Sequence, residues 1–193
     1  MDNKKVKIKN VKNLSNDWHE LNKVNFDYKF KNGVWKNTDR ECYITGNGAC
    51  ILLYNVKNKT IILTRQFRMP SYLNGNNDGM MIEVCAGLLD KDNPITCIKK
   101  EAEEETGYLI KQPIKVLEAF SSPGAITEKI YYFIAEYNHT MKVNEGGGLL
   151  SEDEELEVLE FDFNLALKMI KQREIIDVKT ILLLQYLRIE GIL

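Results

Sequence analysis

Several features that would assign this 193-residue sequence to a familiar class are absent. No apolar run approaches the roughly 20 residues of a membrane-spanning helix, and the longest, residues 181–184, is far too short. No apolar block follows Met1, so we expect no secretion signal and a cytoplasmic protein. The four cysteines form no Cys-x-x-Cys pair, which favours buried thiols over a zinc or disulfide framework.

A charge surplus is also lacking, which limits the partners. The net charge is −2, whereas proteins that bind nucleic acid usually carry a basic surplus. His19 and His139 lie outside every motif, which argues against a histidine nucleophile or a zinc centre. No Gly-x-x-x-x-Gly-Lys-Ser/Thr loop occurs, which excludes a P-loop NTPase. We therefore expect no nucleic acid and no membrane as partner, and an anionic substrate would need local arginines and a metal ion.

The hydrophobic pattern predicts strands interleaved with helices. We expect two or three strands before residue 45, and a surface loop over 70–79. Further strands are expected at 49–54, 60–63, 80–86, 115–120, 130–136 and 157–161. Helices are expected at 94–106, 165–172 and 178–189; Asn93 can cap the first of these and Gly107 suits its end. This order indicates an α/β or α+β sandwich.

The helix expected over 94–106 carries an unfavourable acidic cluster. Glu101, Glu104 and Glu105 are spaced i, i+3 and i+4, so their carboxylates share one face. They repel one another and lie near the helix C-terminus, where the macrodipole disfavours anions. A solvated helix face with Lys99 and Lys100 as partners is the ordinary explanation. A hard divalent cation explains it better, because Mg²⁺ prefers oxygen ligands.

The surrounding residues carry the motif of a known family. Gly87, a short loop and then Lys100-Glu101-Ala102-Glu103-Glu104-Glu105-Thr106-Gly107-Tyr108 resemble the signature of the Nudix hydrolases. The chain departs from that signature at three points. Asn93 replaces its first Glu, Lys100 replaces its Arg, and the spacer between them is one residue shorter. A lysine neutralises the glutamates but does not clamp two of them at once.

The resemblance covers nearly the whole chain and is strongest to the branch that hydrolyses GDP-mannose, which is close to the ADP-ribose pyrophosphatases. Pro123, sixteen residues after Gly107, is characteristic of both branches. The segments that carry the resemblance are 46–49, 63–68, 85–90, 122–124, 127–128 and 146–148. The resemblance implies a Nudix α/β/α sandwich with a mixed sheet over residues 45–193. Residues 1–44 would form a strand arm that crosses to the partner in a homodimer.

The resemblance also implies roles for individual residues. Mg²⁺, which Mn²⁺ can replace, would be held by the Ala86 carbonyl, Glu101, Glu104, Glu105 and Glu154. Glu152 would be the base that activates water, with Glu104 and Glu105 also counted as catalytic. The residues expected to contact the substrate are Arg40, Arg65, Arg68, Glu83 and Glu128. For Arg65 a plain surface position is equally open, and Glu83 and Glu128 could instead brace the site. The acidic loop 151–155, next to the glycines 146–148, could close as a lid or simply be a solvated loop.

The leading interpretation is hydrolysis of GDP-mannose to GMP and mannose 1-phosphate. The alternative is hydrolysis of ADP-ribose to AMP and ribose 5-phosphate. A non-catalytic sensor of nucleotide sugars would predict loss of a helix carboxylate, and all three are present. An mRNA-processing enzyme would call for a basic groove, which the net charge does not suggest.

Overall fold

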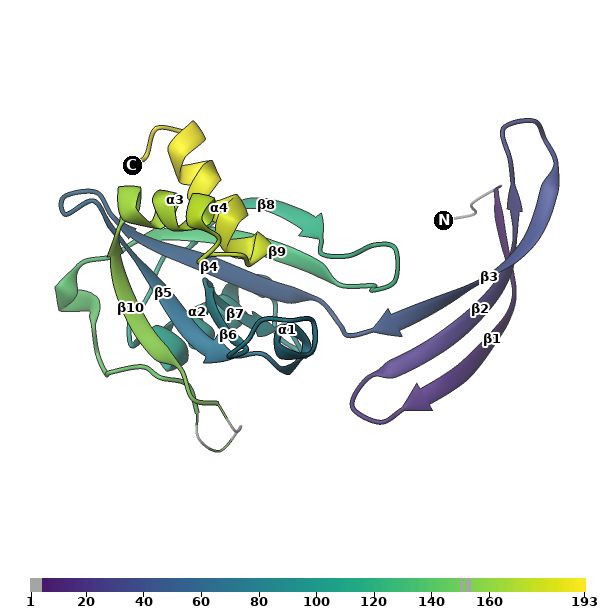
Figure 1. The fold of residues 1–193 in the computed structure, drawn as a ribbon, viewed down its shortest axis with the longest axis horizontal. Helices are drawn as coiled ribbons and strands as arrows, with labels where there is room; N and C mark the ends of the chain where they lie inside the picture. The colour runs from purple at the N-terminus through teal and green to yellow at the C-terminus, as the bar shows by residue number, and fades with distance from the viewer. Residues whose placement is uncertain (1–4, 150, 152–153) are drawn as a thin grey trace. The chain divides into compact units, whose positions relative to one another are not determined.

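The computed structural model describes residues 5–149, 151 and 154–193. The chain divides into two compact units, each with its own internal packing (Figure 1). The larger unit contains residues 48–118 and 131–193, and the smaller contains residues 1–47 and 119–130. Over the described residues, no helix is long and apolar enough to cross a membrane.

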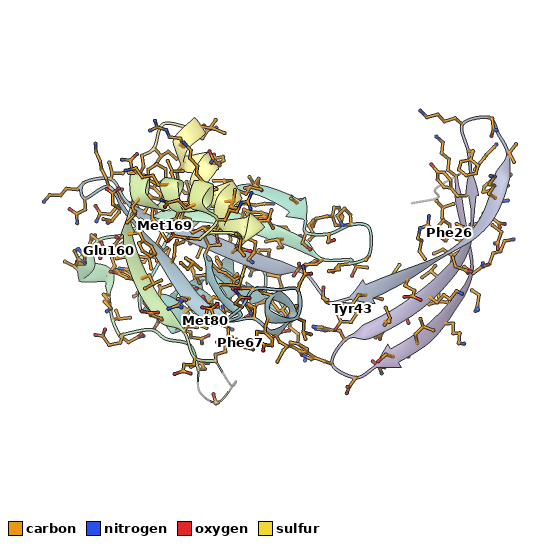
Figure 2. The ribbon with its side chains drawn as sticks, in the orientation of Figure 1. Phe26, Tyr43, Phe67, Met80, Glu160 and Met169 are labelled. Atoms are coloured by element: carbon orange, nitrogen blue, oxygen red, sulfur yellow. The ribbon has the colours of Figure 1, made fainter. Side chains whose placement is uncertain are left out.

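The larger unit is built on a seven-stranded sheet with the order β10-β5-β4-β9-β8; in addition β6 pairs with β5 and β7 pairs with β4. The strands are β4 (Gly48–Asn55), β5 (Thr60–Phe67), β6 (Met80–Glu83), β7 (Cys85–Leu88), β8 (Ile114–Phe120), β9 (Lys129–Glu136) and β10 (Glu157–Asp162). All eight residues of β4 are buried, so this strand forms the centre of the sheet. Phe67 at the end of β5 lies opposite Met80 at the start of β6 (Figure 2).

Helices cover the sheet and complete the core. They are α1 (Met69–Leu73), α2 (Pro94–Thr106), α3 (Phe163–Gln172) and α4 (Val178–Ile189), with a short 3-10 helix at His139–Met141. Figure 1 shows α3 and α4 together above the sheet and α2 behind it. Cys97, Ile98 and Ala102 of α2 pack in one buried cluster with Ile51 and Leu53 of β4. All four cysteines are free thiols. The expected α/β sandwich is confirmed.

The strand expected over 80–86 is in fact two short strands. The backbone N–H of Val84 donates to Thr180 Oγ1 of α4 at 2.8 Å instead of to a neighbouring strand. The chain therefore stops pairing with β5 at Glu83 and starts pairing with β4 at Cys85. The loop expected over 70–79 also begins differently, because the short helix α1 occupies its first residues.

The smaller unit contains a three-stranded antiparallel sheet, β1 (Val6–Asn16), β2 (Glu20–Lys29) and β3 (Trp35–Ile44), in the order β1-β2-β3. Most of its side chains are exposed, including Ile8, Val11 and Trp18, whose exposed fractions are 66%, 53% and 85%. Within this unit, Tyr43 N–H donates to the Ala125 carbonyl at 2.8 Å. So much apolar exposure is typical of a surface that another protein covers.

Candidate active site

Helix α2 begins and ends where the sequence predicts. Asn93 accepts hydrogen bonds from the N–H groups of Ile95 and Thr96 through its side chain, as an N-cap does. Pro94 occupies the first helical position, where its missing N–H has no consequence. Gly107 ends the helix in the left-handed region with a φ of 79°. These caps place the three glutamates in the last two turns of α2.

The most unusual of these glutamates is Glu105. Its side chain is buried, with 2% of its surface exposed, and its Oε2 atom has no hydrogen-bond partner. Burial and, to a lesser degree, the nearby carboxylates of Glu101 and Glu154 together raise the pKa of the carboxyl from 4.5 to about 8. Hydrogen bonds from the Cys85 thiol and the Ala86 backbone oppose this increase. A buried carboxylate with an unpaired oxygen is costly unless another group satisfies it.

A divalent cation is the group that would satisfy Oε2 of Glu105. Glu101 and Glu154 are each close enough to Glu105 to repel it electrostatically, and a hard cation would turn that repulsion into attraction. Over the described residues, no three Asp, Glu, His or Cys side chains already form a metal-binding cluster. The chemistry of the Glu101, Glu105 and Glu154 carboxylates, all oxygen and all anionic, suits Mg²⁺ or Mn²⁺.

The strand β7 approaches α2 closely because Gly87 has no side chain. A Cβ at residue 87 would overlap the carboxylate of Glu101. Ala86, the preceding residue, pairs with Cys50 of β4 and lies against Glu105. The backbone of β7 and the carboxylates of α2 thus meet at one place, as the sequence leads one to expect.

The loop that follows Gly148 contributes one described carboxylate to this group. Glu154 is half-buried and is one of the groups that raise the pKa of Glu105. The predicted base, Glu152, lies outside the described residues. Glu104 is half-buried on α2 next to Glu105.

A second polar group surrounds Glu83, which is 4% exposed at the end of β6. Its Oε2 accepts from Arg68 Nε at 2.7 Å, and its Oε1 accepts from Lys179 Nζ at 3.2 Å. Lys179 Nζ also donates to Asp177 Oδ1 at 2.7 Å. Burial lowers the pKa of Lys179, but the Asp177 and Glu83 carboxylates outweigh burial and raise it overall. Arg68 and Glu83 are thus brought together, and Glu83 braces Arg68.

Lys179 was not singled out from the sequence. It lies in the first turn of α4, two residues after the N-cap Asp177. Asp177 Oδ2 accepts from the Thr180 N–H at 2.9 Å, so the cap holds Lys179 beside Glu83. A lysine two residues after a capping aspartate was the only signal, and it is a weak one.

Arg65 lies apart from this group. It is opposite Ile82 in the pairing of β5 with β6, whereas its neighbour Thr64 is opposite Glu83. Successive residues of a strand face opposite sides of the sheet, so Arg65 and Glu83 face opposite sides. The Arg65 guanidinium is 3.7 Å from Asp78 and 3.5 Å from Glu157. These ion pairs favour the surface position over a role in gripping phosphate.

Arg40 and Glu128 belong to the smaller unit and are described within it. Arg40 is exposed on β3, and its guanidinium donates to the Asp39 carbonyl at 2.7 Å and to Thr38 Oγ1 at 3.2 Å. Glu128 is half-buried next to β9, and its backbone carbonyl accepts from the Ser121 N–H at 3.2 Å. Their predicted contacts with the substrate remain predictions.

Comparison with known families matches nearly the whole chain in two segments. The NUDIX domain model matches residues 45–180. The model described as the GDP-mannose pyrophosphatase NudK N-terminal domain matches residues 5–43. The two segments meet between residues 43 and 45.

Individual relatives cover nearly the whole chain. A GDP-mannose pyrophosphatase of Cronobacter sakazakii is 50% identical over 188 residues, covering 97% of each chain. One from Yersinia enterocolitica is 50% identical over 190 residues, covering 97% of this chain and 98% of the relative. A crystal structure described as an ADP compounds hydrolase superposes with a TM-score of 0.70 at 17% identity over 97% of each chain. At that identity the superposition shows that the fold is shared.

Proposed function

The chain belongs to the Nudix hydrolase family, and we propose that it hydrolyses GDP-mannose to GMP and mannose 1-phosphate. The reaction adds water across one P–O bond of the pyrophosphate bridge, so that each product keeps one phosphoryl group. The observation that supports this substrate is the match of both segments of the chain. Relatives named GDP-mannose pyrophosphatase align over 97% of its length at 50% identity.

Nudix hydrolases generally use divalent metal ions, and we propose Mg²⁺, with Mn²⁺ as a substitute. The proposed ligands are the Ala86 carbonyl and the carboxylates of Glu101, Glu104, Glu105 and Glu154. The unpartnered Oε2 of Glu105, buried among acidic groups, supports this assignment. When bound, the ion neutralises the bridge and lowers the pKa of a bound water.

The remaining steps fall to side chains of the chain. Arg68 presents a guanidinium fixed by Glu83 at 2.7 Å, which suits it to orient a phosphoryl oxygen. Glu152 is the proposed base that accepts the proton of the attacking water. Arg40 is proposed to grip the substrate from the strand arm.

We propose that the chain forms a homodimer in which the arm, residues 1–44, packs on the partner subunit. The arm exposes apolar side chains, as a surface covered in an assembly does. It also contains ten Lys and Arg against six Asp and Glu, a charge of +4, which leaves −6 on residues 45–193. Opposite charges favour packing of the arm on the larger unit of a second copy. Free, mostly buried thiols suit the proposed cytoplasmic location.

A substrate panel tests the proposed reaction. GDP-mannose, GDP-glucose, ADP-ribose and a diadenosine polyphosphate are incubated with the full chain and Mg²⁺, and the products are identified by phosphorus NMR. We expect GMP and mannose 1-phosphate, with GDP-mannose giving the highest kcat/KM. A higher kcat/KM for ADP-ribose would replace the proposed substrate with the alternative one.

Glu103→Gln is the matched control for substitutions of the site carboxylates. Glu103 lies on the same helix and is half-buried, but it is not among the proposed ligands. Glu103→Gln removes one negative charge from α2, as a substitution of a site carboxylate does. Its Mg²⁺-dependent turnover should stay within about threefold of that of the unmodified chain, as expected for a surface substitution. Strong loss of turnover in Glu103→Gln would mean that overall charge, not individual ligands, governs activity.

A further inference from the structure

The glycine segment Gly146-Gly147-Gly148 is held against the end of α2. From the sequence alone it looked like the flexible base of a lid. All three residues have positive φ angles, 70°, 102° and 79°, which side chains rarely adopt. Their conformation is therefore specific, and the contacts that they make explain why.

The segment satisfies carbonyl groups that the end of a helix leaves without partners. The last four carbonyls of an α-helix have no intrahelical N–H. In α2, the Glu103 carbonyl accepts from the Gly107 N–H at 3.0 Å. The Glu105 carbonyl accepts from the Gly147 N–H at 2.9 Å, and the Glu104 carbonyl accepts from the Gly148 N–H at 3.2 Å. Two of the residues that carry proposed metal ligands are thus capped by the glycine segment.

Close packing makes a side chain impossible at the first glycine. A Cβ at residue 146 would lie 2.5 Å from the Glu105 carbonyl oxygen and 2.6 Å from the Thr106 carbonyl carbon. Both are backbone atoms, so no rotation of a side chain relieves the overlap. At Gly147 the nearest atom, the Leu156 carbonyl oxygen, would be 3.5 Å away, an ordinary contact.

The same segment also fixes the base of the acidic loop. The Leu156 N–H donates to the Gly147 carbonyl at 3.0 Å, so Gly147 is bonded to α2 on one side and to the end of the loop on the other. A Cβ at residue 148 would lie 2.9 Å from the Cβ of Glu154. The Glu154 N–H donates to the Leu149 carbonyl at 3.3 Å, which closes this part of the loop.

We propose that Gly146, Gly147 and Gly148 are positioning residues, which lock the carboxylate of Glu154 at a fixed place relative to Glu104 and Glu105. The inference rests on the proposed function, because it concerns the same metal ligands. It differs from a hinge, since the two hydrogen bonds to α2 would break if the segment swung away. These hydrogen bonds come from backbone groups, and a side chain at any of the three positions would add strain or overlap, which accounts for three adjacent glycines.

Amide hydrogen exchange of the metal-free protein tests, without any catalysis, whether the glycine segment is held against α2. The N–H groups of Gly147 and Gly148 are expected to exchange at least about 100-fold more slowly than unprotected amides, because both are bonded to α2. Exchange of both amides at unprotected rates would show an open segment and overturn the proposal.

Substitution by alanine then tests the coupling to the metal ligands. Gly146→Ala introduces a Cβ that must push the segment away from α2. We expect its Mn²⁺ affinity, measured by electron paramagnetic resonance of the free ion, to fall about 10- to 100-fold, the usual range for groups that orient metal ligands. Turnover of GDP-mannose should fall in kcat, while KM for the nucleotide sugar stays within about twofold. Gly191→Ala is the matched control, since Gly191 has a similar φ of 65° and nothing within 4 Å of its Cβ position.

The outcomes separate this inference from the proposed function. If Gly146→Ala and Gly191→Ala bind Mn²⁺ equally well, the positioning role of the glycine segment is wrong, while the proposed metal site stands. If the unmodified chain protects the Gly147 and Gly148 amides from exchange and binds Mn²⁺ but does not hydrolyse GDP-mannose, the positioning role stands and the proposed substrate is wrong. Should Gly146→Ala fail to fold, Gly148→Ala gives a second test, because its Cβ would lie 2.8 Å from Leu156 Cδ1 and 2.9 Å from the Cβ of Glu154. Unchanged Mn²⁺ affinity in that variant would equally refute the coupling.

Discussion

Replacing Glu105 by Gln should stabilise the metal-free protein above neutral pH and abolish its activity. The carboxyl is buried, and its pKa is raised from 4.5 to about 8. Folding therefore favours the protonated form, and the folded state loses stability as the pH rises from 4.5 to about 8. Below pH 4.5 the group is protonated in both states and has no effect. Each pKa unit corresponds to about 1.4 kcal/mol, so the full loss is of the order of 4 to 5 kcal/mol.

The glutamine variant removes this dependence because its side chain has the same shape and no charge. Its amide group leaves a polar atom without a partner, as Oε2 of Glu105 already is. That defect lowers stability by the same amount at every pH. The difference between two pH values therefore isolates the charge. Between pH 5.5 and pH 8.5, the free energy of unfolding of the original chain should fall by about 3 kcal/mol more than that of Glu105→Gln.

Urea denaturation in the presence of a chelator measures these free energies for the original chain, Glu105→Gln and the control Glu103→Gln. The control should follow the pH dependence of the original chain. Parallel pH profiles for the original chain and Glu105→Gln would refute the raised pKa. With Mg²⁺ present, Glu105→Gln should show no measurable turnover; near-normal turnover would remove Glu105 from the metal site.

The remaining predictions concern individual side chains. Arg40→Ala should raise KM for the nucleotide sugar about 10- to 100-fold and change kcat less, because it removes a charged hydrogen bond worth about 1.5–3 kcal/mol; steady-state kinetics with an unchanged KM would exclude Arg40 from the pocket. Lys179→Met should lower the free energy of unfolding by about 3 kcal/mol, because it leaves the buried carboxylates of Glu83 and Asp177 without their shared cation; a loss below about 1 kcal/mol in urea denaturation would contradict this. Asn93→Ala should cost about 1 kcal/mol of stability and Asn93→Ser much less, since serine also caps; equal losses for the two variants in the same assay would disprove the cap.

Local chemistry explains which parts of the fold could be predicted. The limits of α2 follow from residues that act within one turn, the capping Asn93, the first-turn Pro94 and the left-handed Gly107. The three carboxylates on one face follow from helical periodicity alone. Such signals need no knowledge of the rest of the chain, so they could be identified in advance.

Contacts between distant segments could not be predicted in the same way. The break at Val84 depends on a hydrogen bond to Thr180, 96 residues further along the chain. The bracing of Arg68 by Glu83, and of Glu83 by Lys179, depends on how β5, β6 and α4 come together. Nothing in the sequence around residues 80–86 distinguishes one continuous strand from two. The tertiary hydrogen bond decides the outcome.

Glu105 lowers the stability of the metal-free fold, and its proposed role as a metal ligand explains why a carboxylate is there. A glutamine there would be better for a metal-free protein above neutral pH, yet the chain has a carboxylate beside those of Glu101 and Glu154. Proteins retain locally unfavourable residues chiefly where function requires them. A bound cation would bring the pKa back down, so that uptake of metal releases a proton in the range where the free carboxyl is protonated. The destabilising charge and the proposed metal site are therefore two aspects of one arrangement.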